Sequence, residues 1–133
     1  EEIIAQAMEE AESLRRELLD LVRKDMEAFE PLSRLYSMKA ETEEEKERKS
    51  LLMEKALEDA CVVPMEIMEK CGRAIELAGI FAEKGSRLAV SDAGASAILC
   101  KGAMQAASLN VYINTGSMKD RKRAEGRRKR AST

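Results

Sequence analysis

The chain has 133 residues, of which 44% are apolar and 36% are charged, and its formal net charge is −2. Leu, Ile, Ala and Met beside abundant Glu, Lys and Arg, with only two prolines, favour helix over sheet, so we predict one all-helical domain. Histidine is absent, which excludes Ser–His and Cys–His nucleophile pairs and any histidine-ligated metal site.

Residues 1–38 carry the apolar periodicity of an amphipathic helix. The apolar positions recur at alternating spacings of three and four, at Ile4, Ala7, Ala11, Leu14, Leu18 and Leu21. Continuing this row lands on Asp25, a carboxylate where a leucine or isoleucine is expected. A carboxylate among apolar neighbours needs a hydrogen bond or a positive partner to offset its lost hydration. We therefore interpret Asp25 either as a partly buried functional carboxylate or as a sign that the apolar face has rotated.

A second helix is predicted from Thr42 to about residue 83. Thr42 and Glu45 have the spacing of a capping box, and the acidic residues of the first turn suit the helix dipole. Pro64 interrupts the apolar pattern, so the chain either kinks there or ends one helix and begins another. Gly85 is a typical stop signal for this segment.

Residues 90–114 differ from the rest of the chain because they carry only two charges, on Asp92 and Lys101. Small residues crowd this stretch, and a helix that is apolar nearly all round is typical of the interior of a bundle. We therefore predict a multi-helical array with a buried, small-residue central helix, for which Asp92 is a good N-cap. Asn110 and Asn114 share one face, and buried amides require partners. They either bind a polar ligand or tie down a neighbouring backbone.

Residues 119–130 contain eight basic and two acidic residues, a net charge of +6, which leaves −8 on the rest of the chain. We expect a helical domain over residues 1–118, followed by a basic C-terminal tail over residues 119–133. Such a tail is typically a solvated terminus or contacts an acidic neighbouring subunit. Nucleic-acid binding is a weaker alternative, because no aromatic residue is interleaved for base stacking.

Cys61, Cys71 and Cys100 are an odd number of cysteines without a C-x-x-C spacing, which argues against structural disulfides and against a zinc site. We therefore expect reducing, cytoplasmic surroundings. The chain has no run of roughly 18 apolar residues and no signal-peptide pattern, so no membrane contact is expected.

Four blocks of sequence resemble, in the right order, the landmarks of the formiminotransferase-cyclodeaminase family, which includes bacterial methenyltetrahydrofolate cyclohydrolases. The blocks are DMEAF, TEEEKERK, EDACVVP, and SDAGASAILCKGAMQAASLNVYIN followed by KD. The last block is the most specific, because it joins a Ser–Asp pair, a small-residue helix, two asparagines and a Lys–Asp pair.

The resemblance implies a homodimer of all-helical subunits and a one-carbon tetrahydrofolate as substrate, with no metal or redox cofactor. It implies chemistry that opens or closes the ring joining N5 and N10 of the folate. A cyclohydrolase adds water to the methenyl carbon and gives 10-formyltetrahydrofolate, whereas a cyclodeaminase closes the ring and releases ammonia. Both reactions use the same scaffold and substrate class, so the sequence does not separate them.

At the matching positions, the resemblance implies that Asp25 is the general acid or base. It implies further that Asp92, Asn110, Asn114 and Lys119 bind the substrate, although capping alone would also explain Asp92. Family members begin with a glycine-rich segment ahead of the position of residue 1, and residues 1–133 do not contain such a segment. A non-catalytic, dimeric folate-binding module is therefore the alternative interpretation.

Overall fold

The computed structural model describes residues 1–132, and within that range the chain forms four α-helices and one short 3₁₀ turn. The elements are α1 (Glu2–Ser37), α2 (Glu43–Lys84), η1 (Arg87–Ala89), α3 (Val90–Gly116) and α4 (Arg121–Ser132). The prediction of an all-helical fold is confirmed. None of the described helices has both the length and the apolar character that crossing a membrane would require.

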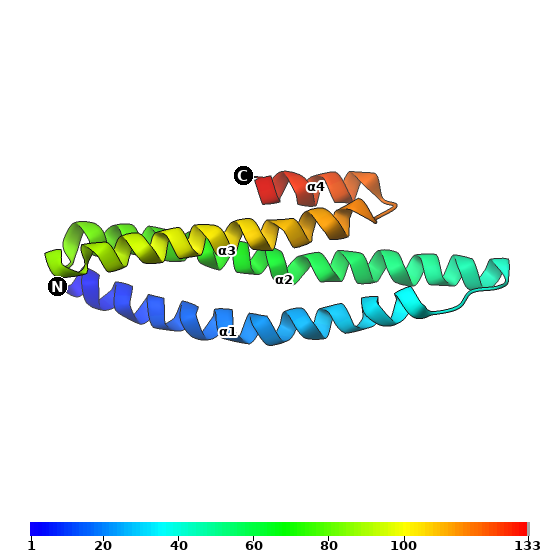
Figure 1. The fold of residues 1–133 in the computed structure, drawn as a ribbon, viewed down its shortest axis with the longest axis horizontal. Helices are drawn as coiled ribbons and strands as arrows, with labels where there is room; N and C mark the ends of the chain where they lie inside the picture. Colours follow the sequence, from blue (N-terminus) through cyan, green and yellow to red (C-terminus); the bar gives the residue numbers. More distant parts are fainter. Residues whose placement is uncertain (133) are drawn as a thin grey trace.

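The four helices run in alternating directions, and α2 is the element on which the others assemble (Figure 1). It contacts α1 along one side and α3 along another, and α4 folds back along α3 and also contacts α2. No Cα atom of α1 comes within 8 Å of a Cα atom of α3. The centre of this array is therefore α2, not the small-residue helix α3 as predicted.

The start of α2 follows the predicted capping box. The N–H of Glu45 donates to the hydroxyl oxygen of Thr42 at 3.1 Å, and the carboxylate of Glu45 accepts from the N–H of Thr42 at 3.3 Å. These bonds satisfy donors that the first turn of a helix leaves free. Further along, α2 continues through Pro64 without interruption, so the alternative of two separate helices is wrong.

Two apolar clusters fasten the helices to one another. The first joins the end of α1, the middle of α2 and the corner between α3 and α4, through Leu32, Ala56, Leu57, Ala60, Met118 and Ala124. The second joins the start of α1 to the end of α2, through Ala7, Leu14 and Leu77. Because the side chains of these clusters are almost fully removed from water, their burial is the main stabilising contribution of the single chain.

The expected burial of α3 on all sides is not found in the single chain. Its buried residues are Ala93, Ala107, Val111 and Thr115. By contrast, Ile98 and Leu99 are each 73% exposed, because they face away from α2 and α4. Apart from the adjoining backbone of α3 itself, no heavy atom of the described residues lies within 4 Å of the place where a Cβ would stand on Gly94 or Gly102. Packing within this chain therefore does not explain why these positions are small.

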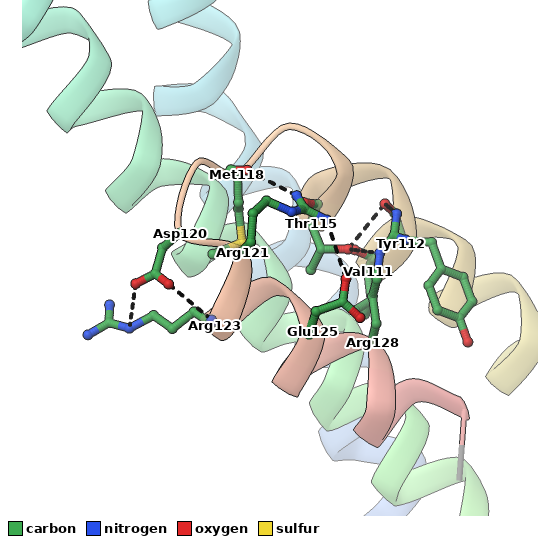
Figure 2. Close-up of polar contacts among 9 residues, drawn as sticks. All are labelled: Val111, Tyr112, Thr115, Met118, Asp120, Arg121, Arg123, Glu125 and Arg128. Atoms are coloured by element: carbon green, nitrogen blue, oxygen red, sulfur yellow. Dashed lines mark hydrogen bonds and ion pairs between the residues drawn. The ribbon is translucent and has the colours of Figure 1, made fainter.

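The residues expected to form a basic tail fold into α4 from Arg121 to Ser132 and pack on α3 and α2. Figure 2 shows Arg128 donating to the hydroxyl oxygen of the fully buried Thr115 at 2.9 Å, and Arg121 donating to the carbonyl oxygen of the same residue at 2.9 Å. Arg127 pairs with the half-buried carboxylate of Glu58 on α2. Part of the positive charge in this segment thus fastens α4 to the bundle.

Candidate active site

A cleft of about 310 Å³ lies where α1, α2 and α3 come together. Asp25 of α1 and both Asn110 and Asn114 of α3 line it, together with Ala60 and Pro64 of α2. The other lining residues are apolar and more than half exposed, namely Met26, Phe29 and Ile113. An apolar lining with a few polar groups is typical of small-molecule sites. The structure thus brings three predicted site residues together from opposite ends of the chain.

The carboxylate of Asp25 is half-buried and has no hydrogen bond or ion pair with any residue that the structure describes. Another aspartate on the same helix is fully engaged, because Asp20 pairs with Arg23 at 2.7 Å and with Lys24 at 3.3 Å. The prediction of a partly buried carboxylate is confirmed. An unpaired carboxylate in an apolar hollow is available to a bound cation or to a proton in transfer.

Asn114 is tied to α2 through a gap in the hydrogen bonding of that helix. Pro64 has no N–H, so the carbonyl oxygen of Ala60, four residues earlier, lacks its ordinary helical donor. The side-chain amide of Asn114 donates to this oxygen at 3.3 Å. Because its NH₂ group is held by Ala60, the amide oxygen of Asn114 is the group left to accept a hydrogen bond from a ligand.

Substitution of Asn114 tests this arrangement. We expect Asn114→Asp to destabilise the fold by about 1–3 kcal/mol, because a carboxylate cannot donate to the Ala60 carbonyl. In a Pro64→Ala background, the new N–H at position 64 satisfies that carbonyl, and the cost of Asn114→Asp should shrink. Urea unfolding of the wild type, both single variants and the double variant measures the coupling. Additive free energies would show that Asn114 does not replace the missing donor.

Asn110 supplies the matched control for that experiment. It lies one turn before Asn114 on the same face, but it is exposed and its side chain makes no hydrogen bond within residues 1–132. Asn110→Asp should therefore leave the free energy of unfolding unchanged within about 0.5 kcal/mol. Its predicted role in binding a ligand stays a prediction.

Asp92 does not lie in this cleft. It occupies the first turn of α3, about 27 Å along the helix from Asn110 at the usual rise per residue. There it lines a different hollow, together with Ser86 and Phe81. The prediction that Asp92 caps the helix is wrong, because α3 begins after Ala89 and no side chain caps it. Within one chain, the structure separates Asp92 from Asp25.

Lys119 also lies outside the cleft, beyond the end of α3. Its backbone N–H donates to a carboxylate oxygen of Glu54 at 2.7 Å, and its ammonium group donates to the hydroxyl of Ser50. An ion pair between Lys119 and Asp120 is not formed; the carboxylate of Asp120 instead accepts from the N–H of Arg123 at 3.1 Å and caps α4. Lys119 belongs to a second hollow on α2.

The cysteines are not candidates for the acid–base role predicted for Asp25. Cys61 and Cys71 are buried, and burial raises the pKa of the Cys61 thiol to about 11 and also raises the pKa of Cys71. Their thiolate forms are therefore scarce at neutral pH. None of the three cysteines lines the cleft. Among residues 1–132, no group of three or more Cys, Asp or Glu side chains is placed to hold a metal ion.

Sequence reasoning missed two features of this region. Ala60 and Pro64 belong to the cleft, although the proline was recognisable only as an interruption of a helix. A larger hollow of about 690 Å³ also opens between α1 and α2, with Pro31 and Leu52 among its lining residues. Charged residues of both signs line it, and nothing in the apolar periodicity of these helices indicated it.

Comparison with known proteins gives two findings. The whole chain, residues 1–133, matches the protein family described as formiminotransferase-cyclodeaminase. A curated protein of Methylorubrum extorquens, named methenyltetrahydrofolate cyclohydrolase, is 36% identical over 126 residues. The aligned region covers 95% of this chain and 61% of that relative, so the chain spans only part of the relative's length.

Proposed function

The chain belongs to the formiminotransferase-cyclodeaminase family, and on that premise we propose that it hydrolyses 5,10-methenyltetrahydrofolate to 10-formyltetrahydrofolate. The relative named as a cyclohydrolase favours this reaction over ring closure with release of ammonia. The observation that carries the proposal is the unpaired carboxylate of Asp25 in a cleft that also holds two asparagines.

The chemistry of the substrate suits such a cleft. The methenyl ring is a cation, and a nearby carboxylate in an apolar hollow stabilises a cation more strongly than one in water does. The apolar side chains of Met26, Phe29 and Ile113 would contact the flat ring system. The amide oxygen of Asn114 would accept a hydrogen bond from an N–H of the pterin, and Asn110 would offer a second polar contact.

The proposed reaction begins when a water molecule adds to the methenyl carbon and gives up a proton to the carboxylate of Asp25. This step forms a C–O bond and neutralises the ring cation. Asp25 then returns the proton to N5 as the bond between that nitrogen and the carbon breaks. The hydroxyl proton leaves to solvent as the carbonyl forms, so the formyl group remains on N10 and one proton is released overall.

The direct test is the decay of methenyltetrahydrofolate absorbance with and without the purified protein, in a buffer where spontaneous hydrolysis is slow. Ammonia release from formiminotetrahydrofolate is measured in parallel. Hydrolysis above the spontaneous rate would support the proposal. Ammonia release alone would shift the assignment to the cyclodeaminase, and absence of both activities would contradict an enzymatic role in this reaction class.

We propose in addition that two copies of the protein associate through the open face of α3. Four large apolar side chains on it are each at least 60% exposed, namely Ile98, Leu99, Leu109 and Ile113. Gly102 lies among them, and apart from the adjoining backbone of α3 no described heavy atom lies within 4 Å of the place where its Cβ would stand, which allows a neighbouring helix to approach closely. An apolar face of this kind on a highly charged chain is typical of an interface.

A charge placed in this face should separate the subunits. We expect Leu109→Glu to weaken self-association by roughly 30-fold or more, because a buried carboxylate without a partner is costly. Sedimentation velocity over a range of protein concentrations measures the effect. Leu88→Glu is the matched control, since Leu88 is 93% exposed and lies in η1, outside this face. A wild type that stays monomeric at high concentration would contradict the proposal.

A further inference from the structure

The open face of α3 carries a symmetric row of side chains, on the side of the helix opposite the buried Val111. All members of the row are exposed and follow one another at spacings of four, three, four, four, three and four, namely Ser91, Ala95, Ile98, Gly102, Ala106, Leu109 and Ile113. At about 100° per residue, these positions stay within about 40° of the direction of Gly102. The row therefore has the same spacing when it is followed from either end, with Gly102 at its centre.

This symmetry suits a second copy of the same helix in the antiparallel orientation. When Gly102 of one copy lies opposite Gly102 of the other, positions equally far from Gly102 on its two sides face each other. Every large apolar side chain of the row then faces a small one, in the pairs Ile98–Ala106, Leu109–Ala95 and Ile113–Ser91. In a parallel pair each residue would face its own copy, so large side chains would meet large ones and the small positions would leave gaps. Close packing therefore favours the antiparallel pair.

Asp92 and Asn110 lie on the same side of α3, because they are 18 residues apart, which is about five full turns. Asn110 lines the active-site cleft, whereas Asp92 lines a hollow of about 390 Å³ near the start of the helix. The helix α1 borders both spaces, with Asp25 in the cleft and both Ile4 and Met8 in the hollow. The cleft and the hollow thus lie on one side of α3, at opposite ends of it.

The antiparallel pair brings the hollow of one copy to the cleft of the other. Its two-fold axis runs between the two helices and perpendicular to both, so the sides that carry Asp92 and Asn110 point the same way in the two copies. Position 92 of one copy lies level with position 112 of the other, since both are ten residues from Gly102. Position 112 is midway between Asn110 and Asn114, which both line the cleft.

We propose that Asp92 of the partner subunit completes the cleft, so that each site combines Asp25, Asn110 and Asn114 of one copy with Asp92 of the other. This inference rests on the proposed function and on the proposed association through α3. Asp92 makes no hydrogen bond or ion pair within residues 1–132, so its carboxylate is free to bind a ligand. In the shared site it places a second negative charge beside the cationic substrate and accepts hydrogen bonds from N–H groups of the pterin.

Mixed dimers test whether Asp92 acts across the interface. Asp25→Asn and Asp92→Asn are each expected to impair hydrolysis when both subunits carry the same substitution, the latter by roughly 10–100-fold in kcat/KM. In a dimer of one Asp25→Asn and one Asp92→Asn subunit, one site contains both substitutions and the other contains neither. An exchanged, equal mixture should therefore regain about one quarter of the wild-type kcat/KM, because about half of the dimers are mixed and each has one intact site.

Two outcomes of this experiment would overturn the inference. If Asp92 served the cleft of its own chain, a mixed dimer would contain no intact site, and the mixture would stay as slow as its components. Affinity tags on the two variants verify that mixed dimers have formed. Full activity of Asp92→Asn alone is the other contrary outcome. Leu109→Glu in both subunits is the control, since it should prevent association and with it the recovery.

Cross-linking tests the arrangement without relying on turnover. Positions 92 and 110 of one chain are about 27 Å apart along α3, so a short bis-maleimide joins cysteines at these positions only between chains. In a Cys100→Ser background, which removes the half-buried thiol of α3, a mixture of Asp92→Cys and Asn110→Cys subunits should give cross-linked dimers, and neither variant alone should.

The absence of cross-linked dimers in the mixture would overturn the inference, and so would cross-linking of either variant alone, which indicates a parallel pair. Both results leave the proposed reaction standing, because they concern only the pairing of the helices. A wild type that turns over neither folate contradicts the reaction instead, and the cross-linking pattern then still decides whether Asp92 reaches the cleft of the partner subunit.

Discussion

Asp25→Asn is expected to lower kcat for the proposed hydrolysis of methenyltetrahydrofolate by roughly 10²–10⁴-fold, the range typical for loss of a general acid or base. The amide cannot accept the proton of the attacking water, and it carries no charge to oppose the ring cation. Because Asp25 makes no hydrogen bond or ion pair within residues 1–132, the substitution removes no contact of the fold. The free energy of unfolding should stay within about 0.5 kcal/mol of the wild type.

The combination of lost activity and retained stability distinguishes a chemical role from a structural one. Asp59→Asn is the matched control, since Asp59 is an exposed aspartate without a partner in the described chain and lines the larger hollow between α1 and α2. Its kcat and KM should equal those of the wild type. If Asp25→Asn and Asp59→Asn hydrolyse the substrate equally fast, Asp25 has no part in the proposed mechanism.

The second large effect is expected in the core. Leu57→Ala should destabilise the fold by about 2–5 kcal/mol, because it opens a cavity where three elements meet. Leu57 is 1% exposed, and its cluster joins Leu32 of α1 to Met118 at the corner between α3 and α4. The neighbouring helices cannot collapse into the space without losing their other contacts. Urea or thermal unfolding followed by circular dichroism measures the loss.

Leu51→Ala serves as the control for this substitution. Leu51 lies on the same helix but is 73% exposed, so its truncation should change the free energy of unfolding by no more than about 0.5 kcal/mol. A similar small loss for Leu57→Ala would mean that this cluster does not hold the helices together.

Periodicity drew attention to Asp25 and to the pair of asparagines, because a helix repeats every 3.6 residues and one misplaced polar residue in an apolar row is visible. Their predicted roles in a site came from the family resemblance. The continuity of α2 at Pro64 was beyond the reach of such reasoning. Asn114, 54 positions after Ala60, donates to the carbonyl oxygen that the proline leaves without its helical partner. A local pattern carries no information about a partner so distant in sequence.

The burial of α3 was predicted wrongly for a related reason. Composition shows that a helix has an apolar surface, but it does not show whether that surface is buried against other helices of the same chain or against another chain. The fold of α4 was missed because the charge of residues 119–130 dominates their composition. A weaker signal was present: Ala124 and Ala131 are seven residues apart, and both are buried. Two small residues on one face of a basic helix allow it to lie close against α3.

The backbones of the two walls of the candidate cleft lie apart, since no Cα atom of α1 comes within 8 Å of one of α3, whereas each of these helices packs closely against α2. We therefore expect motion of α1 against α2 to be only weakly coupled to motion of α3 against α2. A molecule bound between Asp25 and Asn110 would link the walls directly and make the two motions dependent on each other. Binding of such a molecule is then expected to slow amide hydrogen exchange in both α1 and α3, also at residues that do not contact it.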